Sequence, residues 1–261
     1  MPESDLDLLT DAARQAGEIA LYHKAKGLEV EHKPDDAGPV TQADFAVDKA
    51  LREALTAARP SYGWLSEETR DTPDRLGRDR VFIVDPIDGT RSFVNGETTW
   101  AHSLAVVDQG VVTQGVVYLP EMDLLYSADR TGGAFCNGDA LSVSDLSDIH
   151  AARILATKPN MDPKHWRDDV PGFARSHRPS LAYRLCLVAQ GKYDAMLTFR
   201  PSWEWDIAAG ALILSEAGAT VTDRTGHSLR FNNALPQTAG VIGAGAGLHG
   251  QIAERLVYTG Q

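Results

Sequence analysis

Residues 81–93 read VFIVDPIDGTRSF, an apolar run that ends abruptly in carboxylates. Such an ending is typical of a strand that delivers polar groups to the edge of a sheet. Pro86 fixes its own φ and biases Asp85 to an extended conformation, which predicts that the strand breaks there. Asp85 and Asp88 can then converge on one point. Taken alone, the stretch fits an ordinary Asp-rich turn equally well.

The two residues after this turn, Gly89 and Thr90, offer backbone N–H groups at a predicted helix start. A helix start attracts anions because its amide hydrogens lack partners within the helix. Carboxylates and anion-binding amides therefore lie next to each other in the sequence. That combination suits a site in which a cation and a phosphate meet.

Further carboxylates follow other predicted elements. Ser66-Glu67-Glu68 ends the preceding strand, and Trp205-Asp206 opens a helix. Individually, Glu67 and Glu68 fit solvated loop acids and Asp206 fits an ordinary first-turn residue. Together with the turn, they supply oxygen ligands from three separate element ends, as two hard cations and a phosphate require.

The first half of the chain predicts an α+β unit. A capping box at Ser4 opens a helix that Gly27 ends, and a second one, Thr41 with Asp44, opens a helix that ends at Pro60. Asp44 thereby sits in a first helical turn, which capping alone would explain. A hairpin turning at residues 108–110 and an Asn-Gly turn at 137–138 predict antiparallel strands.

The second half, from about Ala152, alternates strands and helices as an α/β layered unit does. The helix after Asp206 is apolar nearly all round, which predicts that it lies buried between two layers. We therefore expect subdomains 1–150 and 151–261, the first carrying most of the metal ligands and the second contributing Asp206. They would form one compact catalytic unit.

Composition excludes several classes of protein. The chain has 261 residues with 25 Lys+Arg against 36 Asp+Glu, and its charge of -11 repels nucleic acid. Its continuous apolar runs, such as residues 207–214, are too short for a membrane span, and the acidic start does not resemble a signal peptide. Cys136 and Cys186 have neither disulfide nor zinc spacing. We expect a cytoplasmic protein without membrane or nucleic-acid partners.

At this point the sequence resembles the inositol monophosphatase superfamily. That family places an acidic pair after a strand, then D-P-[IL]-D-G-T, then W-D-x-A-A-G, and all three occur here in order. The T-x-x-D of residues 41–44, the G-x-x-x-N-G of 133–138 and the C-L-V-A-x-G of 186–191 also match. The resemblance implies a layered αβαβα sandwich, often a homodimer, that hydrolyses small phosphomonoesters with Mg²⁺ and is commonly inhibited by Li⁺.

The resemblance also implies roles for individual residues, carried over position by position. Two or three Mg²⁺ ions are expected per active site. One would be held by Glu67, Asp85 and the carbonyl of Ile87, a second by Asp85, Asp88 and Asp206, and Glu67 would share a third, weaker ion. The amides of Gly89 and Thr90 would bind the substrate phosphate together with Asp88, Asp206 and Arg91. Catalysis would use Thr90, Asp44 and Glu67 to orient and deprotonate a water activated by the metal ions.

The departures from the family pattern concern the substrate. The Glu that binds inositol hydroxyls in inositol phosphatases is missing between Asp194 and Glu204. The Glu204-Trp205-Asp206 spelling resembles the 3′(2′),5′-bisphosphate nucleotidase branch, for which Arg91, Arg184 and Arg200 are candidate contacts to a second phosphate. Each arginine fits a surface or ion-pair role equally well. Histidinol phosphatases also spell D-G-T-[KR]-S-F, so three substrate classes stay open.

Two readings compete with this one. Haloacid-dehalogenase-type phosphatases form an aspartyl phosphate on the first Asp of D-x-D, whereas here the spacing is D-x-x-D. A catalytically idle, metal-binding regulatory protein could share the same fold. The polar segment HKPDDAGP, residues 32–39, fits either a mobile loop over the site or a plain connection.

Overall fold

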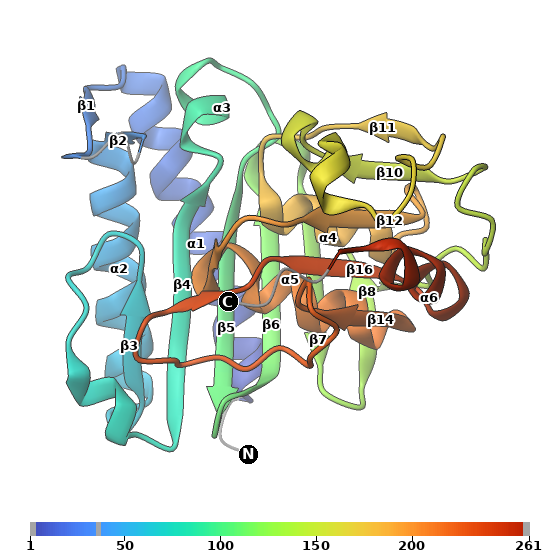
Figure 1. Ribbon diagram of the computed structural model, residues 1–261. Helices are drawn as coiled ribbons and strands as arrows, with labels where there is room; N and C mark the ends of the chain where they lie inside the picture. The colour runs from blue at the N-terminus through green and yellow to red at the C-terminus, as the bar shows by residue number, and fades with distance from the viewer. Residues whose placement is uncertain (1–3, 35–37, 258–261) are drawn as a thin grey trace.

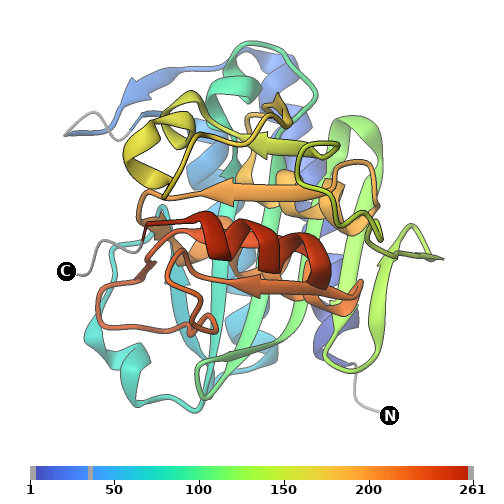
Figure 2. The same ribbon diagram turned by 45° about the vertical axis from the view of Figure 1, so that its right-hand side comes forward.

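The computed structural model describes residues 4–34 and 38–257, which form a five-layered sandwich (Figure 1). The helices α1 and α2 cover one face of a seven-stranded sheet, and α4 and α5 fill the space between it and a five-stranded sheet (Figures 1 and 2). The last helix, α6, covers the outer face of the smaller sheet. The predicted αβαβα architecture is confirmed. The helices are α1 (Asp5–Lys26), α2 (Gln42–Ala58), α3 (Thr90–Val94), α4 (Leu181–Ala189), α5 (Glu204–Glu216) and α6 (Ala246–Arg255).

The larger sheet runs in the order β3-β4-β5-β6-β7-β8-β9. Only β3 and β4 are parallel, and every later pair is antiparallel, as expected for strands joined by short turns. Its strands are β3 (Gly63–Ser66), β4 (Arg80–Asp88), β5 (Ala101–Asp108), β6 (Val111–Leu119), β7 (Leu124–Asp129), β8 (Gly133–Cys136) and β9 (Asp139–Ala140).

The smaller sheet has the order β11-β10-β12-β16-β14, with β10 parallel to both of its neighbours. Two further pairs stand apart from the large sheets: β1 with β2, and β13 with β15. These strands are β1 (Val30–His32), β2 (Pro39–Thr41), β10 (Arg153–Ala156), β11 (Ala174–Ser176), β12 (Ala195–Thr198), β13 (Ser202–Trp203), β14 (Ala219–Thr222), β15 (Gln237–Thr238) and β16 (Val241–Gly245). Short 3₁₀ turns are η2 (Pro73–Gly77), η3 (Pro120–Met122), η4 (Lys158–Met161) and η5 (Pro163–His165).

Local sequence signals set most element ends as predicted. The Ser4 side chain accepts a hydrogen bond from the Asp7 amide at the start of α1, and Gly27 ends that helix with φ 100°. The capping box of Thr41 and Asp44 opens α2. The β5–β6 hairpin turns through Gln109 and Gly110, which both have positive φ, so it is the tight turn that the twist of paired strands favours.

One local prediction is wrong. The strand does not break at Pro86: β4 continues to Asp88, with a register shift against β5 between Asp85 and Asp88. A bulge tolerates proline because the ladder is already interrupted there. The buried ring of His102, on β5, bonds through Nδ1 to the Pro86 carbonyl and fixes the bulge. The bulge, rather than a strand end, lets both carboxylates face one side.

The core extends through both halves of the chain. Helix α5 is buried along nearly its whole length, as its uninterrupted apolar sequence predicted. The largest apolar cluster joins side chains of the seven-stranded sheet to α4, α5 and β12, so the two subdomains share one core. No described helix is both long and apolar enough to cross a membrane.

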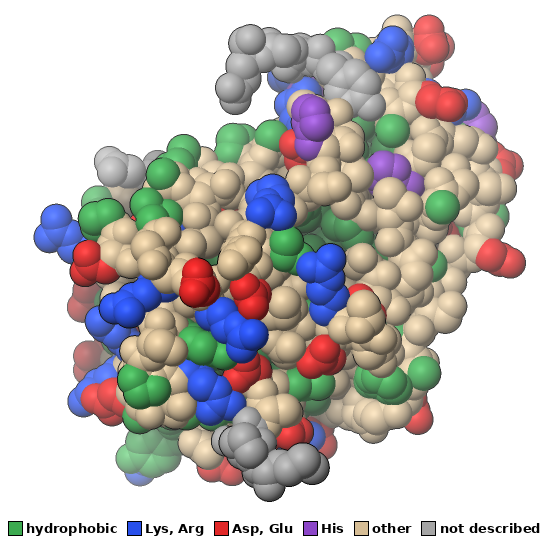
Figure 3. Space-filling view, turned by 90° about the horizontal axis from the view of Figure 1, so that it is seen from below, with side chains coloured by type: hydrophobic (Ala, Val, Ile, Leu, Met, Phe, Trp, Pro, Cys, Tyr) green, Lys and Arg blue, Asp and Glu red, His purple; other side chains and the backbone are tan. Residues whose placement is uncertain are grey.

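At the end of the molecule where β4 begins, acidic and basic side chains alternate over the surface (Figure 3). Arg80, the first residue of β4, pairs with Asp108, the last residue of β5, at 2.9 Å. Nearby, Arg59 pairs with Asp5 at 2.7 Å. Surface pairs such as Arg80 with Asp108 contribute little free energy each.

Candidate metal centre

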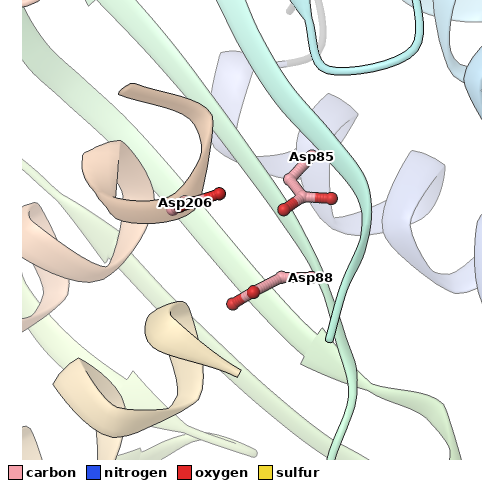
Figure 4. A group of neighbouring side chains, drawn as sticks. All are labelled: Asp85, Asp88 and Asp206. Carbon is pink, nitrogen blue, oxygen red and sulfur yellow. The ribbon is translucent and has the colours of Figure 1, made fainter. Parts of the chain in front are cut away.

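Three aspartates from two distant parts of the chain meet between the sheets. Asp85 and Asp88 come from the bulged end of β4, and Asp206 comes from the first turn of α5. Each offers a carboxylate oxygen within 4.8 Å of the others, and the three side chains border one common space (Figure 4). This carboxylate trio is the centre of the candidate site.

The trio lies in an electrostatically unfavourable environment. Burial raises the pKa of Asp85 well above its usual range, and the neighbouring carboxylates of Glu67, Asp88 and Asp206 raise it further. The pKa of Asp206 is raised for the same two reasons. Buried like charges cost free energy unless a cation neutralises them. The all-oxygen, carboxylate-rich donor set is the type that hard divalent cations prefer, so these residues fit a metal.

Asp88 is held by a contact that the sequence did not reveal. Its Oδ2 accepts hydrogen bonds from Ser180 Oγ at 2.6 Å and from the Ala182 amide at 2.7 Å. Ser180 is also the N-cap of α4. These bonds lower the pKa of Asp88, although burial outweighs them and leaves it raised. The start of α4 thus fixes one carboxylate of the trio.

A hydroxyl and a carboxylate lie together beside the trio. Thr90 Oγ1 is 3.3 Å from Asp44 Oδ1 and 3.1 Å from the carbonyl oxygen of Ile87. Asp44 Oδ2 accepts bonds from the amide and the hydroxyl of Thr41 at 2.8 and 2.7 Å. Burial raises the pKa of Asp44, and the Thr41 bonds oppose this. The structure therefore brings together the predicted pair Asp44 and Thr90, with the Ile87 carbonyl next to them.

Gly89 forms the turn between the trio and α3. Its φ is 96°, a conformation that favours glycine, and a Cβ built there would lie 3.5 Å from the Thr99 carbonyl oxygen. The left-handed turn redirects the chain from β4 into α3, which begins at Thr90. The amides of Gly89 and Thr90 follow directly after Asp88, and their contact with a substrate phosphate stays a prediction.

The acidic pair after β3, Glu67 and Glu68, forms ion pairs with the side chain of Lys33. Lys33 Nζ lies 2.7 Å from Glu67 Oε1 and 2.6 Å from Glu68 Oε1. Burial would lower the pKa of Lys33, but the two glutamates outweigh it and raise the pKa. Glu68, which burial and Glu67 affect most, has a pKa of about 7. Glu67 therefore adjoins the trio, and its charge reaches Asp85, but its carboxylate is paired with Lys33.

The loop that carries Glu67 and Glu68 is tied to α2. Asp48, one helical turn after Asp44, accepts hydrogen bonds from the Ser66 and Thr69 hydroxyls, both at 2.5 Å. Lys33 itself follows β1, at the start of the segment 32–39. Residues 35–37 of that segment lie outside the described residues, so the prediction of a mobile loop stays a prediction.

The three candidate arginines have different surroundings. Arg91 is exposed and lines a cleft of about 550 Å³ together with His32 and Lys33. Arg184 is buried, and its guanidinium donates to the carbonyls of Arg178 and Pro179. Its pKa falls to about 10 because burial outweighs the attraction of Asp88. Exposed Arg200 lies close enough to influence Asp206 electrostatically.

Comparison with known proteins identifies this arrangement. The sequence pattern of the inositol monophosphatase family matches residues 1–260. The chain belongs to the inositol monophosphatase family. An inositol-1-monophosphatase of Rhizobium meliloti is 34% identical over 85% of this chain and 86% of that protein. A histidinol-phosphatase of Mycobacterium tuberculosis is 33% identical over 98% of this chain and 99% of that protein.

The fold agrees with solved members of the inositol monophosphatase family. The IMPase of Thermotoga maritima superposes with a TM-score of 0.81 at 27% identity, covering 95% of both chains. The chain is a phosphatase, and the carboxylate trio could bind a metal. A haloacid-dehalogenase-type enzyme is thereby excluded, and the family together with its phosphatase relatives supports an enzyme rather than an idle regulatory protein.

Sequence reasoning missed several residues of this inositol monophosphatase family site. Ser180 lies ninety-two positions after Asp88, so nothing local indicated their bond. Lys33 was noted only as part of a polar segment, and His102 was assigned no role. The pKa of buried His102 falls to about 4, so it is neutral and donates from Nδ1 to the Pro86 carbonyl. A basic residue in an acidic protein's loop was the one signal available for Lys33.

Proposed function

We propose that this phosphatase is a Mg²⁺-dependent phosphomonoesterase that hydrolyses a small phosphate ester by direct attack of water. The convergence of Asp85, Asp88 and Asp206 beside the Thr90–Asp44 pair carries the proposal. A protein with a charge of -11 needs local positive charge to bind a phosphate. A metal ion bound by carboxylates would supply that positive charge without a pocket of basic side chains.

The proposed metal ligands follow the sequence prediction. Asp85, Asp88, Asp206 and the Ile87 carbonyl would hold two ions, with Glu67 joining after its carboxylate leaves Lys33. Bound Mg²⁺ supplies positive charge that neutralises phosphate oxygens and increases the acidity of a bound water. In this structure Glu67 is paired with the Lys33 ammonium at 2.7 Å, so Glu67 would have to exchange that partner to hold an ion.

Thr90 and Asp44 form the proposed proton path. A hydroxyl has one hydrogen and two lone pairs, so Thr90 can accept a hydrogen bond from the attacking water while donating to Asp44 Oδ1. Because burial raises the pKa of Asp44, its carboxylate accepts a proton more readily than a solvated aspartate does. The water proton would pass through the Thr90 hydroxyl to Asp44 as the oxygen attacks phosphorus. The bond from phosphorus to the ester oxygen would break on the opposite side, and the departing alkoxide would take a proton from solvent water. Amides of Gly89 and Thr90 would hold the phosphate oxygens.

Arg91 is the proposed contact for a second phosphate. Of the three arginine candidates, Arg184 already uses its guanidinium to hold carbonyls of the loop before α4. Arg91, in contrast, is exposed and faces the 550 Å³ cleft beside Lys33. This favours a bisphosphate such as a 3′(2′),5′-bisphosphate nucleotide. An inositol monophosphate and histidinol phosphate are the alternatives, in keeping with the names of the relatives.

The test is release of inorganic phosphate with Mg²⁺, with and without Li⁺, and in chelator. The substrates are inositol 1-phosphate, adenosine 3′,5′-bisphosphate, histidinol phosphate and fructose 1,6-bisphosphate. We expect Mg²⁺-dependent release that the chelator abolishes and Li⁺ inhibits, fastest with the bisphosphate nucleotide. Release that persists in chelator, or an acid-stable phosphoenzyme on Asp85, would contradict the mechanism.

A matched pair of variants tests the substrate assignment separately. Arg91→Ala should reduce kcat/KM for the bisphosphate nucleotide at least tenfold more than for inositol 1-phosphate, since only the former has a second phosphate. Arg130→Ala, at an exposed hairpin tip far along the chain, should change neither. Equal losses on both substrates would remove Arg91 from this role. Homodimer formation and a cytoplasmic location stay predictions.

A further inference from the structure

Glu204 is a fully buried carboxylate that the proposed chemistry does not use. It begins α5 and has an exposed fraction of 0%. Its Oε2 accepts a hydrogen bond from the Asn232 amide at 2.6 Å. Its Oε1 accepts two more, from the amide and the side-chain nitrogen of Asn233, at 2.9 and 2.7 Å. The side chain therefore points into the protein interior and is not available to a substrate.

The two asparagines are themselves fixed by a buried arginine. Arg75, in η2, is 3% exposed and donates from Nη1 to Asn232 Oδ1 at 2.6 Å and from Nη2 to the Asn233 carbonyl at 2.9 Å. Its Nε donates to Asp71 at 2.7 Å. The connection between β3 and β4, the loop before β15 and the start of α5 are thus joined through one network.

This network ends two residues before Asp206, in the same helical turn. The side chain of Trp203, the N-cap, makes no capping hydrogen bond to α5. The Glu204 amide donates to the Pro236 carbonyl at 3.0 Å, and Ser103 Oγ on β5 donates to the Trp205 carbonyl at 3.0 Å. Asp206 must stay next to Asp85 and Asp88 although their charges repel one another. Some attachment has to hold the first turn of α5 against that repulsion.

We propose that Glu204 is a positioning residue that holds the first turn of α5, and with it the carboxylate of Asp206, against Asp85 and Asp88. The inference rests on the proposed function, because it concerns the geometry of the metal ligands. Groups that orient metal ligands commonly change metal affinity 10–100-fold when mutated, and Glu204 acts on Asp206 through the helical turn that the two residues share. A buried acid that only stabilises the fold would lower stability without changing metal affinity.

The test uses the full chain, freed of metal by a chelator and then dialysed. Glu204→Gln keeps the size of the side chain but sets an amide NH₂ against N–H donors. Asp194→Asn is the matched control: Asp194 is also buried, at 4% exposed, and bonds Arg153 on the smaller sheet, away from α5. Mg²⁺ affinity is measured by calorimetry, and thermal unfolding is measured on the same samples.

We expect Glu204→Gln to weaken Mg²⁺ binding at least tenfold, while Asp194→Asn binds as the wild type does despite a similar loss of thermal stability. The kcat of Glu204→Gln should recover at high Mg²⁺ with an unchanged KM for substrate. Asn233→Ala removes one of the three bonds to Glu204 and should weaken Mg²⁺ binding by a smaller factor. It serves as the test if Glu204→Gln fails to fold.

The outcomes separate this inference from the proposed function. A wild type that binds Mg²⁺ together with a Glu204→Gln variant of equal affinity would overturn the positioning role and leave the proposed function standing. The same holds if Asp194→Asn loses as much affinity as Glu204→Gln, since the effect would then follow general stability. A wild type that binds no Mg²⁺ at all would overturn both.

Discussion

Thr90 shows how one hydroxyl can connect two parts of the candidate site. Its oxygen lies within hydrogen-bonding distance of both Asp44 Oδ1 and the Ile87 carbonyl, but it has one hydrogen to donate. Donation to Asp44 leaves its lone pairs free to accept a hydrogen bond from the attacking water of the proposed reaction. The residue therefore matters to the proposed reaction through the orientation of water and the path of its proton, not through charge.

We predict that Thr90→Ala lowers kcat by a factor on the order of 10²–10⁴, the range typical of a lost proton-transfer group. KM should change little, because the phosphate contacts at this position come from the backbone. Thr90→Ser keeps the hydroxyl and should retain most of the rate. Steady-state kinetics on the three proteins at saturating Mg²⁺ decide the matter; similar kcat values for Thr90→Ala and Thr90→Ser would place the proton path elsewhere.

Single residues also mark how far the sequence predicts this site. The aspartates of D-P-I-D-G-T were recognisable because they end an apolar run, and Asp206 because it opens one. Their partners were not recognisable. Ser180 reaches Asp88 only through the packing of α4, and Lys33 reaches Glu67 only through the path of the β1–β2 hairpin. Local spacing identifies side chains of unusual chemistry, whereas their contacts depend on the complete fold.

At the scale of elements, α4 and α5 approach each other so closely that a glycine is required. A Cβ at Gly210, in α5, would lie 2.8 Å from Leu185 Cδ1 and 3.2 Å from the Ala182 carbonyl oxygen, both on α4. Two helices in this close contact hold two ligand groups: Ala182 binds Asp88, and α5 carries Asp206. Their spacing therefore sets the spacing of the trio.

Overpacking usually costs about 1–3 kcal/mol, and alanine in a helix interior gains about 1 kcal/mol over glycine. Because the new Cβ would meet Leu185 at 2.8 Å, we predict that Gly210→Ala destabilises the protein by a net ~1–2 kcal/mol. Gly250→Ala, in α6, has nothing within 4 Å of the new Cβ and should instead stabilise by about 0.5–1 kcal/mol. Urea unfolding measures both. If both variants increased the free energy of unfolding, the packing around Gly210 would be looser than the distances indicate.

Elements also show which predictions fail and why. Caps and tight turns were predictable because a few neighbouring residues determine them, as at Thr41 or Gly110. The end of β4 was not, because Pro86 alone favours a break while pairing with β5 and the bond to His102 keep the strand going. The short strands β1 and β11 lacked a clear pattern for the same reason: tertiary pairing creates them.

At the scale of the whole molecule, the two halves of the chain meet where the three carboxylates of the trio repel one another. Two carboxylates belong to the larger sheet and the third to a helix that packs against both sheets. Folding without a metal thus brings together charges that the unfolded chain keeps apart. The pKa values of Asp85 and Asp206 are raised above the value of about 4 that solvated aspartates have.

The direction of those shifts sets the pH dependence of the metal-free protein. A carboxyl group whose pKa is higher in the folded state contributes stability below the unfolded pKa of about 4 and loses it as pH rises through the folded value. At neutral pH these raised pKa values should therefore lower the free energy of unfolding of the metal-free wild type. Asp85→Asn removes one of the charges, so it should unfold at a higher temperature than the wild type at neutral pH, with the difference vanishing near pH 4.

With a divalent cation bound, the wild type should become more stable than Asp85→Asn. At a hundredfold excess over its Kd, Mg²⁺ would stabilise the wild type by about 2.7 kcal/mol, which for a chain of this size raises Tm by on the order of 5–10 °C. Asp85→Asn, lacking a shared ligand, should gain almost nothing and show no phosphatase activity. Thermal unfolding of both proteins in chelator and in Mg²⁺ makes the comparison. A metal-free variant less stable than the wild type at neutral pH would contradict this prediction. Asp85 would then stabilise the fold, through the hydrogen bond that it accepts from the Ile87 amide, by more than the repulsion costs. The stability of this site would then not depend on its metal.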